Sequence, residues 1–479
     1  MRWLAAVGAF VVAVLAGCTG ETADYVPPST TPSRLTVPPT PLTVPSPGEG
    51  EGPLGAKWDW GRFEAFEPYV RRLSGGATFY ELVWCQIEET QGERAWTTVD
   101  RIASRAERSG VELMLKIRVG QCWATGEKGA FVRGNKAKTE SGVPRSEQEY
   151  TDFVSDAVRR YSPRGVRVWA VENEVNSASF WAGTTAEYER LVATAARAVR
   201  SADPAAVIVD AGMSSTSYGV GIAQRLIDDG DEDAAVQAWN TYYSRRFGTR
   251  GDELTRVAGV DELRVALAGD QQRRNADYLA ATIRLLDQGV VDVRQVHFYE
   301  DAAAVDLFTD YLRATTPAGA PIEAWEVGSF VRGAELSQEE QVADLAEKVS
   351  VLLGAGMRKV LWLPLIPNPT GRNADEPRSG LLAPDASVRP LGEVYARLAA
   401  DARAARVDPV AEGDVRGVAL TRQGKSVAYV WSTGDQVQPA PGMRVEALVP
   451  GSPATDVVGR EPVRVTGAST PEELWEAAP

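Results

Sequence analysis

Short apolar or β-branched runs alternate with amphipathic helical patterns from residue 54 to about residue 403 of this chain. Several helical patterns begin with Ser or Thr followed by an acidic residue or Gln, and several end near a glycine, which are signals for helix ends. Regular strand–helix alternation predicts a parallel sheet covered by helices. Eight repeats predict a closed (β/α)8 or TIM barrel, an α/β fold. The expected strands lie at 54–58, 77–84, 111–119, 167–174, 206–212, 293–299, 321–328 and 359–366.

A doubly wound nucleotide-binding sheet is the main competitor for such a pattern. The loop after the first expected strand contains neither a G-x-G-x-x-G sequence nor a Walker lysine, so this alternative lacks its usual phosphate-binding loop. We therefore assign residues 54–405 to the barrel and expect no cofactor. After residue 407 the pattern changes to short strands punctuated by Gly, Pro and Asp, which predicts a small β-sandwich over residues 406–479.

The connection over residues 213–290 is too long for a plain βα unit. It contains several helical stretches, including the one at 235–247. Two interpretations remain open. The segment is either an insertion that walls one side of the barrel mouth or an elongated crossover helix with surface decoration.

The N-terminus carries the pattern of an exported lipoprotein. Residues 1–17 hold a positive charge at Arg2 and then an apolar run, too short to span a bilayer, that fits a signal peptide. The sequence LAGC ending at Cys18 resembles the bacterial lipobox, whose cysteine is lipidated and becomes the new N-terminus. The alternative is an ordinary secretory signal with a chance cysteine. We expect a protein lipid-anchored to the cell membrane through Cys18 and facing the extracytoplasmic side.

Residues 18–53 are expected to form a disordered tether. This segment holds nine of the 29 prolines and many Ser, Thr and Gly residues. Because proline fixes φ and lacks an N–H group, such a segment stays extended and solvated. A tether of this kind suits a protein whose substrate lies in the cell wall or in a surrounding polymer.

Charge and composition exclude several classes of function. Lys plus Arg total 51 against 65 Asp plus Glu, a formal net charge of −14, which disfavours nucleic acid and anionic lipid as partners. The chain has one histidine and three cysteines. So few imidazoles and thiols make a His-rich metal site, a zinc ribbon or a Ser-His-Asp enzyme hard to build. We expect no metal, and carboxylates are left to carry the chemistry.

Two glutamates stand at the ends of apolar strands. Glu174 ends the fourth expected strand and Glu326 ends the seventh. The carboxyl ends of barrel strands converge on the active site, and a carboxylate placed there is costly unless it is paired or protonated. A glutamate at a strand end is usually solvated or ion-paired, but two facing each other match the acid and the nucleophile of glycoside hydrolysis.

The sequence resembles clan A of the glycoside hydrolases, most nearly the family 39 type and its family 5 relatives. The motifs that carry the resemblance are Asn-Glu at 173–174, Glu-x-Gly at 326–328, His-Phe-Tyr at 297–299, the strand-two continuation at 83–100, and the passage at 380–390. They occur in the clan's order and at its strand ends, within residues 54–403. The resemblance implies a TIM-barrel glycosidase.

The resemblance also implies roles for individual residues. Glu174 corresponds to the general acid/base and Glu326 to the nucleophile of a retaining double displacement. Asn173 corresponds to the residue that binds the sugar 2-hydroxyl. Tyr299 corresponds to a donor to the nucleophile, and His297 to a residue lining the same wall.

Three further residues allow two interpretations each. Trp362, which ends the eighth expected strand, either offers its indole face to a sugar or packs in the core. His297 is either a site residue or a core histidine with satisfied hydrogen bonds. Glu172 either orients Asn173 or pairs with an arginine such as Arg118.

Cys85 and Cys122 end the second and third expected strands, which are neighbours in a barrel. Extracytoplasmic proteins keep disulfides, so pairing of these two cysteines is plausible. Two buried thiols are the alternative.

Our first hypothesis is a monomeric, membrane-anchored retaining glycosidase that cleaves O-glycosyl bonds of an extracellular or cell-wall polysaccharide or oligosaccharide. The alternative is a non-catalytic carbohydrate-binding lipoprotein in which Glu172 and Trp325 abolish turnover. A solute-binding lipoprotein of a transporter fits the tether, but the two similar α/β lobes usual in such proteins are not seen in the sequence.

Overall fold

A computed structural model describes residues 52–126, 131–133, 136–138, 140–248, 254–329, 336–367, 380–449, 451–452 and 455–474. The expected signal peptide, Cys18 and nearly all of the expected tether lie outside these residues and stay predictions. Among the described helices, none combines the length and the hydropathy that crossing a bilayer requires.

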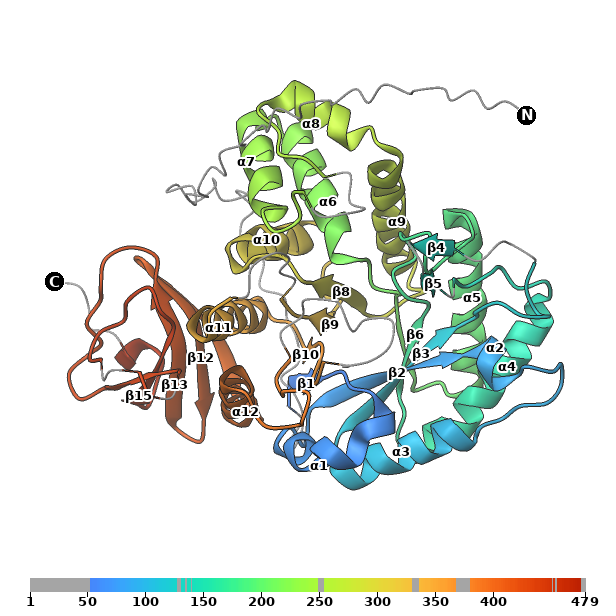
Figure 1. The fold of residues 1–479 in the computed structure, drawn as a ribbon, viewed down its shortest axis with the longest axis horizontal. Coiled ribbons are helices and arrows are strands. Elements are labelled where there is room, and N and C mark those ends of the chain that lie inside the picture. The colour runs from blue at the N-terminus through green and yellow to red at the C-terminus, as the bar shows by residue number, and fades with distance from the viewer. Residues whose placement is uncertain are drawn as a thin grey trace, which may run out of the picture. The chain divides into compact units, whose positions relative to one another are not determined.

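Eight parallel strands form the expected (β/α)8 barrel (Figure 1). Hydrogen bonds join them in two runs, β2-β3-β6-β7 and β1-β10-β9-β8, and a bridge from Val209 to Val293 links β7 to β8. The ring closes between β1 and β2, where a Cβ on Gly55 would lie 1.8 Å from the carbonyl oxygen of Ala77, so only glycine fits there. The strands are β1 (Leu54–Ala56), β2 (Ala77–Val83), β3 (Glu112–Arg118), β6 (Val168–Val171), β7 (Val207–Val209), β8 (Arg294–Phe298), β9 (Ile322–Val327) and β10 (Val360–Trp362).

Helices surround these strands, and their ends follow the sequence signals. Thr184 and Ser337 each form a capping box with the glutamate three residues further on, which fixes the start of α5 and of α11. The helices between barrel strands and after β10 are α1 (Phe63–Arg72), α2 (Trp84–Ile87), α3 (Thr97–Ser109), α4 (Glu147–Tyr161), α5 (Thr185–Ala202), α10 (Val305–Thr315), α11 (Gln338–Gly354) and α12 (Pro390–Ala402). A short ribbon of β4 (Phe131–Arg133) and β5 (Lys136–Lys138) follows β3.

The long connection between β7 and β8 folds as a helical insertion. It contains α6 (Ser215–Asp228), α7 (Glu232–Tyr242), α8 (Val260–Leu267) and α9 (Asp270–Asp287), where a plain barrel unit has a single helix. Helix α9 packs against α5 and α6. The insertion interpretation therefore holds, and hydrogen bonds from α9 to the loop after β6 place it at the mouth of the barrel.

An antiparallel sheet with the order β11-β12-β13-β15-β14 follows the barrel. One of its faces packs on α11. The other face has a small core of its own, completed by a second layer in which Val437 and Val458 form a bridge and Leu474 is buried. This arrangement fits the expected C-terminal β-sandwich. The strands are β11 (Arg406–Glu412), β12 (Val415–Arg422), β13 (Lys425–Ser432), β14 (Arg444–Ala447) and β15 (Val463–Ala468).

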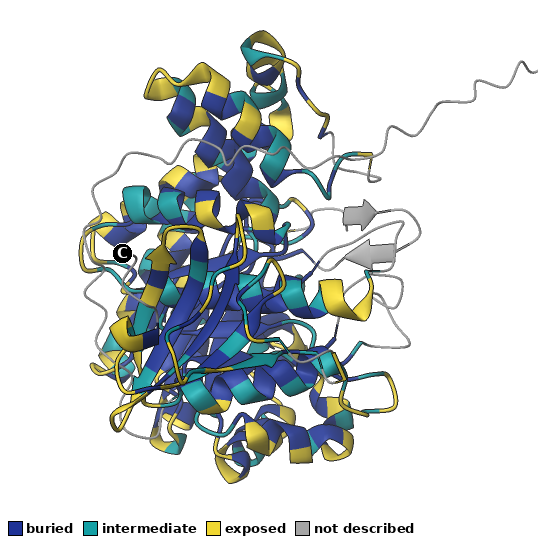
Figure 2. Ribbon diagram, turned by 90° about the vertical axis from the view of Figure 1, so that its left-hand side faces the viewer, coloured by how far each residue is buried: buried dark blue, intermediate teal, exposed yellow. Residues whose placement is uncertain are grey.

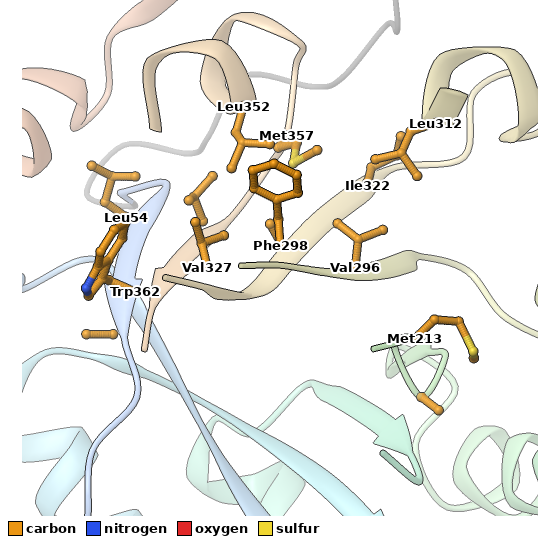
Figure 3. Packing of buried hydrophobic residues seen from close by; sticks show 14 of the residues in the cluster. Leu54, Met213, Val296, Phe298, Leu312, Ile322, Val327, Leu352, Met357 and Trp362 are labelled. Atoms are coloured by element: carbon orange, nitrogen blue, oxygen red, sulfur yellow. The ribbon is translucent and has the colours of Figure 1, made fainter. Parts of the chain in front are cut away.

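The main core lies between the strands and the helices. Figure 2 shows the strands mostly buried, while exposed residues collect on the outer helix faces and the loops. Figure 3 shows part of this layer, in which Val296 and Phe298 of β8 and Ile322 of β9 point toward the helices. A separate cluster that includes Phe79 and Trp325 fills the barrel interior. Because side chains alternate along a strand, each strand contributes to both layers.

Candidate active site

The two glutamates predicted from the sequence lie together at the carboxyl ends of the strands. Glu326 belongs to β9, and Glu174 follows β6 on a short loop. Their side chains are 10% and 16% exposed, respectively. An oxygen of one carboxylate lies within 4.8 Å of an oxygen of the other. Retaining glycosidases hold their carboxyl groups about 5–5.5 Å apart, whereas inverting enzymes need about 6.5–9.5 Å. The pair therefore has the close spacing of a retaining site.

His297 connects the two carboxylates. Its Nδ1 atom lies 2.9 Å from Oε1 of Glu174 and 3.6 Å from Oε2 of Glu326, and the imidazole is fully buried. On the other side of the ring, the amide nitrogen of Gln295 lies 3.3 Å from Nε2. A Cβ on Gly212, which has a φ of 65°, would lie 2.7 Å from that Nε2 atom. Close packing therefore fixes the orientation of the imidazole ring. The ring in turn holds the two carboxylates that it contacts.

Both oxygens of Glu326 have donors nearby. The hydroxyl of Tyr299 donates to Oε2 at 2.9 Å, as the resemblance implies. The ammonium of Lys116, which is fully buried on β3, lies 3.6 Å from Oε1. These two contacts hold the Glu326 carboxylate in place through both of its oxygens.

Lys116 also determines how Asn173 is presented. Its Nζ atom donates to Oδ1 of Asn173 at 2.5 Å, so the amide nitrogen of Asn173 is the end left for a ligand. Sequence reasoning missed Lys116. The available signal was a single lysine between Leu115 and Ile117 in an otherwise apolar stretch, on the same strand face as the buried Met114.

The loop that carries Glu174 has an unusual backbone. Glu172 has a φ of 67° and Glu174 a φ of 43°, a left-handed conformation that costs a non-glycine residue about 1–2 kcal/mol. Glu172 is buried, and its carboxylate accepts from the backbone N–H of Val119 at 2.7 Å and lies 3.5 Å from Nε of Arg118. Burial raises the pKa of Glu172, and Arg118 and Val119 oppose this change. The arginine-pairing interpretation of Glu172 is therefore the one observed.

The same residues have the composition of a possible metal site. Glu174, His297 and Glu326 can offer ligand atoms that all lie within 4.8 Å of one another, within the described part of the chain. However, the ammonium of Lys116 beside Glu326 would repel a divalent cation. Lys116 and Tyr299 already contact the two oxygens of Glu326, so this carboxylate fits the role of a metal ligand poorly.

Comparison with known proteins gives a match in fold alone. No family model and no curated protein matches the chain. A solved family 39 glycoside hydrolase from the gut symbiont Bacteroides cellulosilyticus WH2 aligns with a TM-score of 0.57 and 14% identity, over 87% of this chain and 81% of that one. A monomeric β-xylosidase from Caulobacter crescentus CB15 aligns with a TM-score of 0.53 and 15% identity, over 88% and 97%. This chain has the fold of a family 39 glycoside hydrolase.

One residue of the expected site lies elsewhere in this family 39 fold. Trp362 is fully buried and faces the helix layer, where it packs near Tyr395 and beside Leu54 (Figure 3). Its neighbour Leu361 faces the barrel interior instead. The sugar-platform interpretation is therefore wrong for this structure, because the alternation of side chains along β10 turns the indole away from the barrel interior and into the helix layer.

Helix α9 of the insertion holds the loop of Glu174 in place. The guanidinium of Arg274 donates to the carbonyl oxygens of Asn176 and Val175 at 2.9 Å and of Trp181 at 3.0 Å. These carbonyls belong to the segment that follows Glu174, so the long insertion has a structural role at the site. The sequence of the insertion contains no signal that predicts the contact of Arg274 with this segment.

Replacing Arg274 with Met is expected to lower kcat on aryl glycosides about 10–100-fold, because small displacements of catalytic groups are costly. KM should change much less, since Arg274 is a positioning residue. Steady-state kinetics measures the split, and Arg274→Lys should recover part of kcat. Arg273→Met is the matched control, because Arg273 is exposed and pairs with Asp270. Equal loss in both variants would contradict the positioning role.

Cys85 and Cys122 form a disulfide beside the site, with a Cα–Cα distance of 5.5 Å. Cys85 lies in α2 after β2, and Cys122 lies after β3. The bond joins the segments that follow two neighbouring strands at the mouth of the barrel. The prediction of pairing from strand adjacency is confirmed.

Replacing both Cys85 and Cys122 with Ser is expected to lower the free energy of unfolding by about 2–4 kcal/mol, because the bond closes a loop in the unfolded chain. Denaturant unfolding of the oxidised protein and the variant measures this difference. Reductant should bring the wild-type protein to the stability of the variant and leave the variant unchanged. Unchanged unfolding midpoints in the double variant would contradict the prediction.

Proposed function

We propose that this protein is a retaining glycoside hydrolase that acts on an extracellular or cell-wall polysaccharide or oligosaccharide. The observation that carries the proposal is the pair Glu174 and Glu326, with carboxylate oxygens within 4.8 Å at the mouth of a (β/α)8 barrel. The different environments of the two carboxylates support different roles. Glu326 accepts from Tyr299 and forms an ion pair with Lys116, whereas Glu174 contacts the imidazole of His297 and is the more exposed side chain.

In the first step, the carboxylate of Glu326 attacks the anomeric carbon and forms a glycosyl ester, while Glu174 donates its proton to the departing glycosidic oxygen. In the second step, Glu174 takes a proton from water. That water attacks the anomeric carbon, and the ester bond to Glu326 breaks. The two inversions leave the configuration of the anomeric carbon unchanged.

Three neighbours assist these steps. The Asn173 amide nitrogen donates to the sugar, because Lys116 already holds its oxygen. Tyr299 and Lys116 stabilise the carboxylate that Glu326 becomes again when the ester breaks. His297 keeps the carboxylate of Glu174 in position between the two steps.

We further propose that the enzyme is anchored outside the cytoplasmic membrane through lipid on Cys18. Support comes from the lipobox-like sequence and from the proline-rich segment that follows it. Metabolic labelling with a fatty-acid probe should mark the wild-type protein and not Cys18→Ala. Equal labelling of both would remove this part of the proposal.

The central test is hydrolysis of 4-nitrophenyl glycosides and of a panel of polysaccharides, with NMR of the first anomer released. We expect turnover with retained configuration, and none above background for Glu326→Gln. A first product of inverted configuration would overturn the double displacement. Glycan binding without any product would favour the non-catalytic alternative. That alternative holds Glu172 and Trp325 responsible for the loss of turnover. Both side chains are fully buried, so neither is exposed to contact a substrate.

A further inference from the structure

A second lysine ammonium lies near the proposed catalytic pair. Lys57 directly follows β1, and its Nζ atom donates to the carbonyl oxygen of Phe79 at 2.9 Å. Nζ of Lys57 and Nζ of Lys116 both lie 4.5 Å from the centroid of the Phe79 ring. The two nitrogens are therefore at most twice that distance apart, and Lys116 is the residue that contacts Glu326 and Asn173.

Two cations near Lys57, Arg118 and Lys116, are paired with carboxylates. Arg118 lies 3.0 Å from Glu81 and 3.5 Å from Glu172, and Lys116 lies 3.6 Å from Glu326. Burial alone would raise the pKa of Glu81, but the surrounding cations outweigh it and hold that pKa at about 2, so Glu81 stays charged.

Lys57 differs from these cations. Within the described part of the chain, no carboxylate oxygen lies within 4.0 Å of the Lys57 Nζ atom, the limit for an ion pair. Glu81, Glu326 and Asp59 attract the ammonium from further away. Burial lowers the pKa of Lys57, and the nearby charge of Lys116 acts in the same direction. A single carbonyl contact therefore leaves two N–H groups of the ammonium for other acceptors.

The side chain of Lys57 is not fully enclosed. Lys116 is fully buried, but Lys57 is partly exposed, and the side chain of nearby Glu81 is 33% exposed. A sugar substituent in contact with Lys57 would displace water from this ammonium. An ammonium in such a place is stabilised much more by an anion than by a hydroxyl group.

We infer that Lys57 binds an acidic substituent, a carboxylate or a sulfate, on the sugar that reacts with Glu326. The inference rests on the proposed glycosidase function and narrows its substrate to an acidic polysaccharide. The formal charge of −14 belongs to the whole chain, whereas the charges around Lys57 are mixed: Lys116 repels it, and Glu81, Glu326 and Asp59 attract it.

The test compares matched 4-nitrophenyl glycosides in both anomeric forms: glucuronide with glucoside, galacturonide with galactoside, and 6-sulfated with unsulfated hexosides. We expect the acidic member of one pair to have the higher kcat/KM. Lys57→Met should lower the acidic-to-neutral ratio about 10–100-fold, the range expected for losing a charge-assisted contact. Lys57→Arg should keep most of the ratio. Lys425→Met, which removes an exposed ammonium from β13, should not change it.

A ratio near one in the wild-type protein, or one that Lys57→Met leaves unchanged, overturns the inference while the glycosidase function stands. If no glycoside of either kind is hydrolysed, the proposed function itself fails. Binding then decides the role of Lys57. Oligogalacturonate and neutral xylo-oligosaccharide are titrated into Glu326→Gln and into the same variant carrying Lys57→Met. Tighter binding of the acidic ligand that disappears with Lys57→Met supports acid recognition, and equal binding rejects it.

Discussion

Replacing Glu326 with Ala is expected to reduce the hydrolysis of aryl glycosides by about 10⁴-fold or more, the scale seen when a covalent nucleophile is removed. Among the described residues, Glu326 is the carboxylate that accepts from Tyr299 and forms an ion pair with Lys116. Without Glu326 the glycosyl ester cannot form. Initial rates of nitrophenol release measure the loss.

Azide distinguishes a missing nucleophile from a damaged site. Azide can enter the space left by the carboxylate and attack the anomeric carbon, while the aryl oxide leaves. The product is a glycosyl azide whose configuration is inverted relative to the substrate. Glu339→Ala, at an exposed position in the first turn of α11, is the control for loss of a glutamate as such. More than a tenth of wild-type activity in Glu326→Ala would remove Glu326 from the nucleophile role.

The barrel and the catalytic pair could be predicted because both depend on local patterns. Eight apolar strands between capped helices specify the barrel, and a barrel brings the carboxyl ends of all its strands to one face. Glu174 and Glu326 therefore meet although 151 positions separate them in the sequence. The same adjacency argument applied to Cys85 and Cys122, which lie after neighbouring strands.

Trp362 shows where strand-based prediction fails. The side of a strand on which a residue lies changes with every position, so a shift of one residue reverses the assignment. The pairing of β10 with β9 shifts register between Val360 and Trp362. The sequence alone contains no signal for that irregularity, and the indole faces the helices.

The lysines and Arg274 were missed for a different reason. Hydrophobic patterns treat a charged residue as exposed, but Lys116 can be fully buried because it forms an ion pair with Glu326 and donates to Asn173. Arg274 binds carbonyl oxygens about 100 positions away in the chain. Such contacts depend on how the insertion folds back over the barrel, and only the tertiary structure shows this.

Glu174→Ala should have an effect that depends on the leaving group. With an alkyl glycoside or an oligosaccharide, the departing oxygen needs the proton of Glu174, so we expect a loss of about 10²–10⁴-fold. A dinitrophenyl group departs without that proton, so the ester on Glu326 should still form quickly. Its hydrolysis should then be slow, because no base activates water. Rapid-mixing kinetics should show a burst of dinitrophenol followed by a slow steady state.

Azide should accelerate that slow phase, because it attacks the ester carbon without losing a proton. The resulting glycosyl azide should keep the configuration of the substrate, since Glu326 has already inverted it once. The two variants therefore give opposite azide anomers from one substrate, and a misfolded site gives neither. Equal losses with good and poor leaving groups would instead make Glu174 a positioning residue. The 2.9 Å contact with His297 would then be its main role.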